Sequence, residues 1–311
     1  MTMATDAPAV REVQPGGSRK PRNAMRRRNT LIGWSFILPN FLGFGLVTLI
    51  PVVFLFYMAF TEWSAFGDPE FLGFDNFTRL IGDGSFQTSL GNTLYYSVFH
   101  IPLTLVAALS LAMLLNTKLR GVAFFRTAAF FPYITAVVAI AAVWSQLFSA
   151  DGVINQILGV VGLDPGVGWT ADSTLAMPAV ILVSVWRDTG FFMLLYLAGL
   201  QTVPRTLYEA ARVDGASAWQ RFWNVTWPCL RPTTFFVTVM LTIQSLKVFD
   251  LVFLLTAGGP GQSTFVLAQF IYQKGIVEFE YGYASAGAIV LFSMSLVVTI
   301  VQFLVNKRIE R

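Results

Sequence analysis

Six long apolar stretches constrain this chain more than any other feature of its sequence. They cover about residues 33–60, 92–115, 122–148, 174–200, 233–256 and 284–305. An α-helix needs about 20 mostly apolar residues to cross a bilayer. The composition agrees, because 55% of the 311 residues are hydrophobic and only 12% are charged, whereas soluble domains carry about 25% charged residues. The sequence therefore predicts an all-α membrane protein with six transmembrane helices.

Prolines inside these stretches predict that several of the helices are kinked. A proline removes one backbone donor, and a membrane helix tolerates this where neighbouring helices satisfy the freed carbonyl. The prolines concerned are Pro39, Pro51, Pro102, Pro132 and Pro178.

The distribution of lysine and arginine predicts the orientation of the chain. If the amino terminus is cytoplasmic, 17 of the 21 basic residues fall on the cytoplasmic side, which is the asymmetry expected of a membrane protein. The outer loops hold only Arg79 and Lys274, and Arg187 and Lys247 fall inside spans. Both termini are therefore predicted to be cytoplasmic. The basic charge therefore indicates topology. The sequence shows no basic patch with a recognition element, so a nucleic-acid partner is not predicted.

Two regions are predicted from composition. Residues 1–30 are polar and basic and predict a disordered cytoplasmic tail. Residues 31–311 form the predicted six-helix membrane domain, and its first span is too long for the core of a signal peptide. The single cysteine, Cys229, and the single histidine, His100, exclude a disulfide framework and a Cys/His metal cluster within one chain.

A charged loop of about residues 201–232 separates the fourth and fifth spans. Its central sequence is LYEAARVDGASAWQRFWNVTWP. Pro204 suits the first turn of a helix, and Glu209 can pair with Arg212 three residues later. Gly215 is placed to end that helix in the left-handed conformation.

A second short helix is predicted after this turn. Ser217 and Gln220 have the spacing of a capping box, and Pro228 is predicted to end the helix before the next span. Two interpretations of the loop remain open. The aromatic residues Trp219, Phe222 and Trp223 favour an interfacial helix pair that anchors in lipid headgroups. The small, charged surface of Glu209, Ala210, Ala211 and Asp214 favours docking of a soluble protein.

Charged side chains inside spans four and five are the second unusual feature. Arg187 and Asp188 lie in span four, and Lys247 and Asp250 lie three residues apart in span five. One interpretation is a set of structural ion pairs, Asp188 with Lys247 or Arg187 with Asp250. The other is a polar wall along a permeation path, to which Trp186 and Gln244 would add a stacking surface and an amide. His100 is isolated from other candidate ligands and is predicted to be a packed histidine.

The sequence contains no motif for catalysis. It has no G-x-x-x-x-G-K-[ST] phosphate loop. The stretch Gly258-Gly259-Pro260-Gly261-Gln262-Ser263-Thr264 is glycine-rich but lacks the lysine, and it is interpreted as a turn. The chain is therefore predicted not to be an enzyme by itself.

The charged loop resembles the EAA loop of bacterial ABC importer permeases, most closely those of the carbohydrate-uptake class. The resemblance covers roughly residues 30–308 and extends well beyond the loop. The similar stretches are FLGFDNF at 71–77, the Asp151-Gly152…Asn155 pattern, LAGLQTVPRTLYEAARVDGASAWQRF at 197–222, LLTAGGPGQST at 254–264 and YGYASAGAIVLF at 281–292. The chain departs from the family pattern at Val225-Thr226-Trp227-Pro228, where the family usually has Ile, a spacer, Leu and Pro.

The resemblance implies a type I ABC importer permease fold in the bacterial plasma membrane. It implies that the loop docks as a coupling helix in a cleft of a separate ATPase subunit. The matching residues are Glu209, Ala210, Ala211, Asp214 and Gly215. It also implies a second homologous permease, two ATPase subunits that bind ATP and Mg, and an extracellular solute-binding protein. No cofactor is then expected in this chain, and its other partners are a sugar substrate and membrane lipid.

Other functions remain open beside a sugar importer. Arg187 and Lys247 keep an importer of glycerol-phosphate or another polar solute in consideration. An ion-coupled secondary transporter would use a titrating carboxylate, for which Asp188 or Asp250 could serve, but it has no need of a docking loop. A membrane anchor without transport would not need polar residues in spans four and five.

Overall fold

A computed structural model describes residues 22–309 except 65–66, 118–119, 163–165 and 167. The predicted tail over residues 1–21 and Lys118 of the orientation argument lie outside the described residues. The chain divides at Phe54 into two compact units, residues 1–54 and 55–311. This boundary lies farther along the chain than the predicted one at residue 30.

The first unit contains one long helical segment. Helix α1 (Arg22–Phe44) continues through the π-helical turn η1 (Gly45–Leu49) into α2 (Ile50–Ala59), whose last residues belong to the second unit. Because α1 begins at Arg22, the last nine residues of the predicted disordered tail are helical. Arginine is a good helix former, so the apolar helix extends into the basic segment before it.

The second unit is built mainly from helices. A two-stranded antiparallel sheet of β1 (Thr61–Glu62) and β2 (Glu70–Phe71) follows α2. The helices of the first half are α3 (Asp75–Gly82), α4 (Gly84–Leu115), α5 (Val122–Ile134), α6 (Val137–Leu147) and α7 (Val153–Val160). The second half contains α8 (Ala176–Thr202), α9 (Arg205–Val213), α10 (Ala218–Arg221), η2 (Phe222–Thr226), α11 (Trp227–Leu246), α12 (Asp250–Thr256), α13 (Leu267–Tyr272), η3 (Gln273–Val277) and α14 (Tyr281–Ile309).

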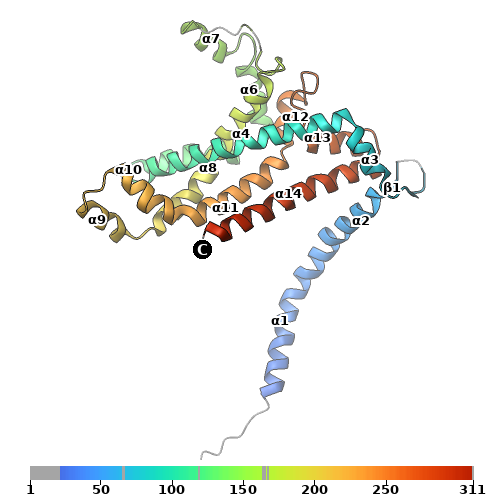
Figure 1. The fold of residues 1–311 in the computed structure, drawn as a ribbon, viewed down its shortest axis with the longest axis horizontal. Helices are drawn as coiled ribbons and strands as arrows, with labels where there is room; N and C mark the ends of the chain where they lie inside the picture. The colour runs from blue at the N-terminus through green and yellow to red at the C-terminus, as the bar shows by residue number, and fades with distance from the viewer. Residues whose placement is uncertain (1–21, 65–66, 118–119, 163–165, 167, 310–311) are drawn as a thin grey trace, which may run out of the picture. The chain divides into compact units, whose positions relative to one another are not determined.

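Helices α4, α8 and α11 pack together in the middle of the second unit, and α14 lies along α11 (Figure 1). One buried apolar cluster contains Phe192 and Met193 of α8 together with Leu241 of α11. Gly190 of α8 allows a close approach to α5, because a Cβ atom there would overlap the backbone of Ala129. Small residues permit such close packing of membrane helices.

Within the part of the chain that the structure describes, four helical segments are long and apolar enough to cross a membrane, and the number rises to six if each of two bent pairs counts as one span. The four are Ile32–Ala59, Gly84–Leu115, Ala176–Thr202 and Tyr281–Arg308. The all-α membrane class is thus confirmed, while the count of six and the cytoplasmic termini stay predictions.

Two of the predicted spans are bent pairs of helices, and a kink was predicted for only one of the two breaks. Helices α5 and α6 meet at 96°, and the break follows Pro132, one of the prolines predicted to kink a span. The segment Ala218–Leu246 meets α12 at 46°. No proline or glycine lies at that break, which falls at Lys247-Val248-Phe249.

Candidate functional site

The first candidate site is the loop of residues 201–232, called the coupling loop for the role that the family resemblance implies. Helix α9 follows Pro204, which stands just before the helix rather than inside its first turn. Gly215 has a φ of +75°, and the Ala216 N–H donates to the Ala211 carbonyl at 2.9 Å. This bond and the left-handed glycine form a helix end of the predicted type.

The predicted capping box is confirmed, but the predicted end of the second helix is wrong. The Ser217 N–H donates to Gln220 Oε1 at 2.8 Å, and the Gln220 N–H donates to Ser217 Oγ at 3.3 Å. Helix α10 then runs through η2 into α11 without interruption, and Pro228 lies in the first turn of α11. The wider π turn has its own i→i+5 bond from the Trp227 N–H to the Phe222 carbonyl, and a proline is tolerated in a first helical turn.

The residues matched to the family motif face solvent. Glu209, Ala210, Asp214 and Gly215 are exposed, and Ala211 is half-buried. The predicted pair of Glu209 with Arg212 is wrong, because no salt bridge joins them among the described residues. Their charges therefore stay available to a partner.

Contacts on the other side of the loop hold α9 against the start of α11. The hydroxyls of Tyr208 and Thr226 lie 2.9 Å apart. The rings of Trp219, Phe222 and Trp223 pack against one another with centroids 5.1–6.2 Å apart. The sequence pattern identifies these aromatics as a group, but it gives no signal for Tyr208, whose partner Thr226 lies 18 residues away.

The second candidate site is a polar cavity of about 280 Å³ between α4, α5, α8, α11 and α12. Five of the six predicted pathway residues line it: Arg187, Asp188, Gln244, Lys247 and Asp250. Trp186 does not line this cavity. It is 44% exposed and packs edge-on against Trp144, with centroids 5.4 Å apart.

His100 is the buried partner of Asp188 in the cavity wall. Its Nδ1 lies 2.8 Å from Ser245 Oγ, and its ring stacks on Tyr96 with centroids 5.0 Å apart. Its Nε2 lies 3.2 Å from Asp188 Oδ2, although this contact lacks the geometry of a hydrogen bond. The prediction of a packed histidine is confirmed, and the structure adds that His100 joins α4 to α8 and α11.

The predicted ion pairs across the cavity are wrong. No salt bridge joins Asp188 to Lys247 or Arg187 to Asp250 in the part of the chain that the structure describes. The Arg187 guanidinium lies 5.8 Å from the centre of the Tyr133 ring. Lys247 and Asp250 lie three residues apart in the predicted fifth span, but the break between α11 and α12 places Lys247 after the end of one helix and Asp250 at the start of the next.

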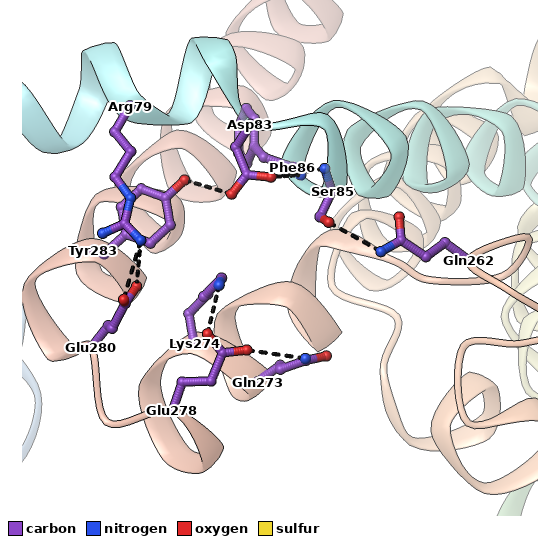
Figure 2. Close-up of polar contacts among 10 residues, drawn as sticks. All are labelled: Arg79, Asp83, Ser85, Phe86, Gln262, Gln273, Lys274, Glu278, Glu280 and Tyr283. Atoms are coloured by element: carbon purple, nitrogen blue, oxygen red, sulfur yellow. Dashed lines mark hydrogen bonds and ion pairs between the residues drawn. The ribbon is translucent and has the colours of Figure 1, made fainter.

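The end of the second unit that carries α3, opposite to the coupling loop, contains a network of paired polar side chains (Figures 1 and 2). Arg79 of α3 donates two bonds to the Glu280 carboxylate, at 3.0 and 3.1 Å, and lies 4.0 Å from the centre of the Tyr283 ring. The Tyr283 hydroxyl donates to Asp83 Oδ2 at 2.8 Å. This network ties α3 and the start of α4 to α14.

Asp83 also caps helix α4. Its Oδ1 accepts the N–H groups of Ser85 at 2.8 Å and Phe86 at 3.3 Å. Burial raises the pKa of Asp83, but the hydrogen bonds from Tyr283, Phe86 and Ser85 outweigh it and hold the pKa below its ordinary value. The capped turn explains why α4 begins at Gly84, eight residues before the predicted span.

The same end carries two further paired contacts. Glu278 accepts from Lys274 at 2.6 Å and from Gln273 at 3.1 Å, and the bond from Lys274 lowers the pKa of Glu278. Gln262 donates to Ser85 Oγ at 3.0 Å. Gln262 belongs to the glycine-rich stretch, which forms the predicted turn between α12 and α13. None of these pairs was predicted from the sequence.

The chain is similar to known proteins over most of its length. Residues 101–311 match the family model described as "Binding-protein-dependent transport system inner membrane component". The chain is 36% identical over 292 residues to the probable ABC transporter permease protein YesP of Bacillus subtilis (strain 168), covering 93% of this chain and 94% of YesP. It is 35% identical over 289 residues to the lactose transport system permease protein LacF of Rhizobium radiobacter, covering 91% and 96%.

A solved structure shows the same fold. It is a bacterial alginate ABC transporter in complex with an alginate pentasaccharide-bound periplasmic protein, and its matching chain has a TM-score of 0.80 and 27% identity. The match covers 93% of this chain and 98% of that chain.

Proposed function

Since the chain belongs to the family of binding-protein-dependent transport system inner membrane components, we propose that it is the membrane-spanning subunit of an ATP-driven sugar importer. In this proposal it forms half of the translocation path, and a second homologous permease forms the other half. Two ATPase subunits bind ATP and Mg, and an extracellular binding protein delivers the sugar. One observation about the coupling loop carries the proposal. Its charged side chains are exposed, while the contact between Tyr208 and Thr226 holds its backbone in place.

The coupling loop is connected to the cavity by a continuous helical segment. Ala218–Leu246 is helical throughout and therefore about 40 Å long at about 1.5 Å per residue. The Tyr208–Thr226 contact ties α9 to this segment near its start, and Gln244 and Lys247 lie at its other end in the cavity wall. A force on Glu209, Ala210, Ala211, Asp214 or Gly215 from a moving ATPase would thus reach the wall of the path.

The cavity lining suits a sugar. Tyr133 and Phe249 provide aromatic faces, and Gln244 and Asp250 provide groups that bind hydroxyls. Sites for small molecules combine apolar walls with a few placed polar groups in this way. The lactose and alginate systems to which the chain is similar support the same substrate class.

The cationic side chains of the cavity favour a second candidate substrate. Arg187 and Lys247 both line it, and neither forms a salt bridge among the described residues. Such free cations would also bind a phosphate, so glycerol-phosphate or another polar solute is the alternative cargo.

The test is sugar-stimulated ATP hydrolysis and uptake by the reconstituted complex in proteoliposomes, with the binding protein and a panel of sugars. Wild type is compared with Glu209→Ala, and Arg120→Ala serves as a control because Arg120 is also exposed but lies outside the loop. We expect one sugar to stimulate hydrolysis in wild type and in the control. Glu209→Ala should lose this stimulation.

Two results would contradict parts of the proposal. If glycerol-phosphate stimulates ATP hydrolysis and no sugar does, the proposed substrate would be wrong, while the proposed ATP-driven mechanism would stand. Uptake that proceeds without any ATPase and follows a proton or sodium gradient would overturn the importer itself, and Asp188 beside His100 would become the residue to study.

A further inference from the structure

A groove of about 720 Å³ runs between α11 and α14, away from the polar cavity. Its walls include Trp227, Phe235 and Thr238 of α11 and Val301 of α14. Phe235 packs edge-on against Phe303 with centroids 4.9 Å apart, which joins the two helices along the groove. Most of this lining is apolar, as expected of a surface in contact with hydrocarbon.

One end of the groove is polar and basic. Arg231 and Asn306 line it there, and Lys307 and Arg308 follow in the last turn of α14. Arg231 is exposed, and it forms no salt bridge among the described residues. No aspartate or glutamate stands among the described residues that line the groove.

The polar end lies at the depth of lipid headgroups. Arg231 is in the first turns of α11, directly after the coupling loop, and Asn306 is near the end of α14. Thr238 and Val301 stand seven and five residues deeper along their helices, which places them about 8–10 Å farther into the bilayer. Tryptophans such as Trp227 favour the same interface.

An arginine at this depth needs an anion, because a charge near hydrocarbon is costly without a partner. No carboxylate pairs with Arg231 among the described residues, while the cytoplasmic leaflet supplies anionic phosphates. The distribution of basic residues predicts that this end is cytoplasmic. The groove thus combines a cation at headgroup level with an apolar channel below it, which matches the two parts of a phospholipid.

We propose that the α11–α14 groove binds an anionic phospholipid of the cytoplasmic leaflet, with its phosphate at Arg231 and an acyl chain along Phe235 and Val301. Arg231 contacts the phosphate through charge-assisted hydrogen bonds, which a planar guanidinium makes in pairs. The bound lipid would lie directly beside the segment that links the coupling loop to the cavity. This site is separate from the proposed sugar path.

The test measures phosphatidylglycerol binding to the delipidated complex by native mass spectrometry, with phosphatidylcholine as the neutral probe. Arg231→Gln is compared with Arg120→Gln, a matched loss of one exposed arginine away from the groove. We expect Arg231→Gln to bind phosphatidylglycerol about tenfold more weakly, since a lost charged hydrogen bond corresponds to at least that factor. Arg120→Gln should retain the binding, and Arg231→Lys should bind more weakly than wild type but more tightly than Arg231→Gln, because lysine keeps the charge and cannot make paired bonds.

A second measurement identifies what occupies the groove. Benzoylphenylalanine in place of Phe235 keeps an aromatic ring in the groove and cross-links to its neighbour under light. Labelling of phosphatidylglycerol in vesicles of phosphatidylglycerol and phosphatidylethanolamine supports the proposal. Labelling of a polypeptide instead, or equal loss of binding in Arg231→Gln and Arg120→Gln, would overturn it.

Discussion

The two ends of the helical domain differ in how they use their charges. At the end that carries α3, Arg79 is paired with Glu280, Lys274 with Glu278, and Asp83 with Tyr283 and two backbone N–H groups. At the end that carries α9, Glu209 and Asp214 are exposed and form no salt bridge within the described residues. The first end is thus held together by its own side chains. At the second end, the charges are exposed and can contact another molecule.

The backbone of the exposed end is nevertheless well defined. Gly215 sets the turn, the capping box of Ser217 and Gln220 starts the next helix, and Tyr208 contacts Thr226. A surface that is preformed in this way loses little conformational freedom on docking. The comparison therefore predicts that substitutions in the loop impair coupling to a partner, and that substitutions in the paired network impair the stability of the chain.

The largest effect is expected at Gly215. Alanine at a left-handed φ of +75° costs about 1–2 kcal/mol, and a Cβ atom there would meet no neighbour, so backbone strain is the cause of any change. We expect Gly215→Ala to reduce sugar-stimulated ATP hydrolysis about tenfold or more. Gly91→Ala is the control, because Gly91 lies in α4 with open space around it, and that change should stabilise the helix by about 0.5–1 kcal/mol.

Asp83→Ala should give the next largest effect, this time on stability. It removes the cap of α4 and leaves the Tyr283 hydroxyl without its acceptor, at a cost of about 1.5 kcal/mol in unfolding free energy. Thermal unfolding of the complex should show a lower midpoint, and docking of the ATPase should be unchanged. If Asp83→Ala weakened ATPase docking as much as a loop variant such as Gly215→Ala does, the two ends would not differ in function.

The same residue predicts an acid dependence. The pKa of Asp83 is lower in the folded chain than its ordinary value of 3.8, so its ionised form stabilises the fold. This contribution is complete above the ordinary pKa and is lost as pH falls through the lower folded pKa. The midpoint difference between wild type and Asp83→Ala should therefore be constant near neutral pH and shrink only below about pH 4. A difference that already shrinks between pH 7 and 5 would contradict this.

Tyr208→Phe should have a moderate effect. It removes the hydroxyl that contacts Thr226 and leaves the ring in place. The free energy that holds α9 against the start of α11 should fall by about 1 kcal/mol, which is a local change within the loop. We expect normal thermal stability of the helical domain and a severalfold weaker stimulation of ATP hydrolysis by sugar. Thr226→Val tests the same contact from the other side, and the double variant should be no worse than either single one.

The smallest effect is expected for the Arg79–Glu280 pair. Both side chains are partly exposed, and exposed ion pairs contribute about 0.2–1 kcal/mol. A double-mutant cycle of Arg79→Ala and Glu280→Ala, followed by thermal unfolding at low and high salt, measures this coupling. It should fall as salt rises, and a coupling that does not change with salt would mean that the two carboxylate contacts are not electrostatic.

The sequence predicts the class of fold and the outline of the loop because both depend on local patterns. Apolar length predicts the spans, and the spacing of Ser217 and Gln220 predicts the cap. The break between Lys247 and Asp250 has no proline or glycine to indicate it. The contact of His100 with Asp188 joins residues 88 positions apart. Tertiary packing decides both features. It also decides the contacts of Arg79 with Glu280 and of Asp83 with Tyr283, which join residues 201 and 200 positions apart.

Cross-linking from the coupling loop tests the central claim most directly. Cys229, the only cysteine, is first replaced by serine, and Ala210→Cys or Glu70→Cys is then introduced at an exposed position of one end or the other. In the assembled, transport-active complex, we predict that Ala210→Cys cross-links to the ATPase subunit in an ATP-dependent way and that Glu70→Cys does not. An active complex in which Ala210→Cys never reaches the ATPase would contradict the assignment of this loop.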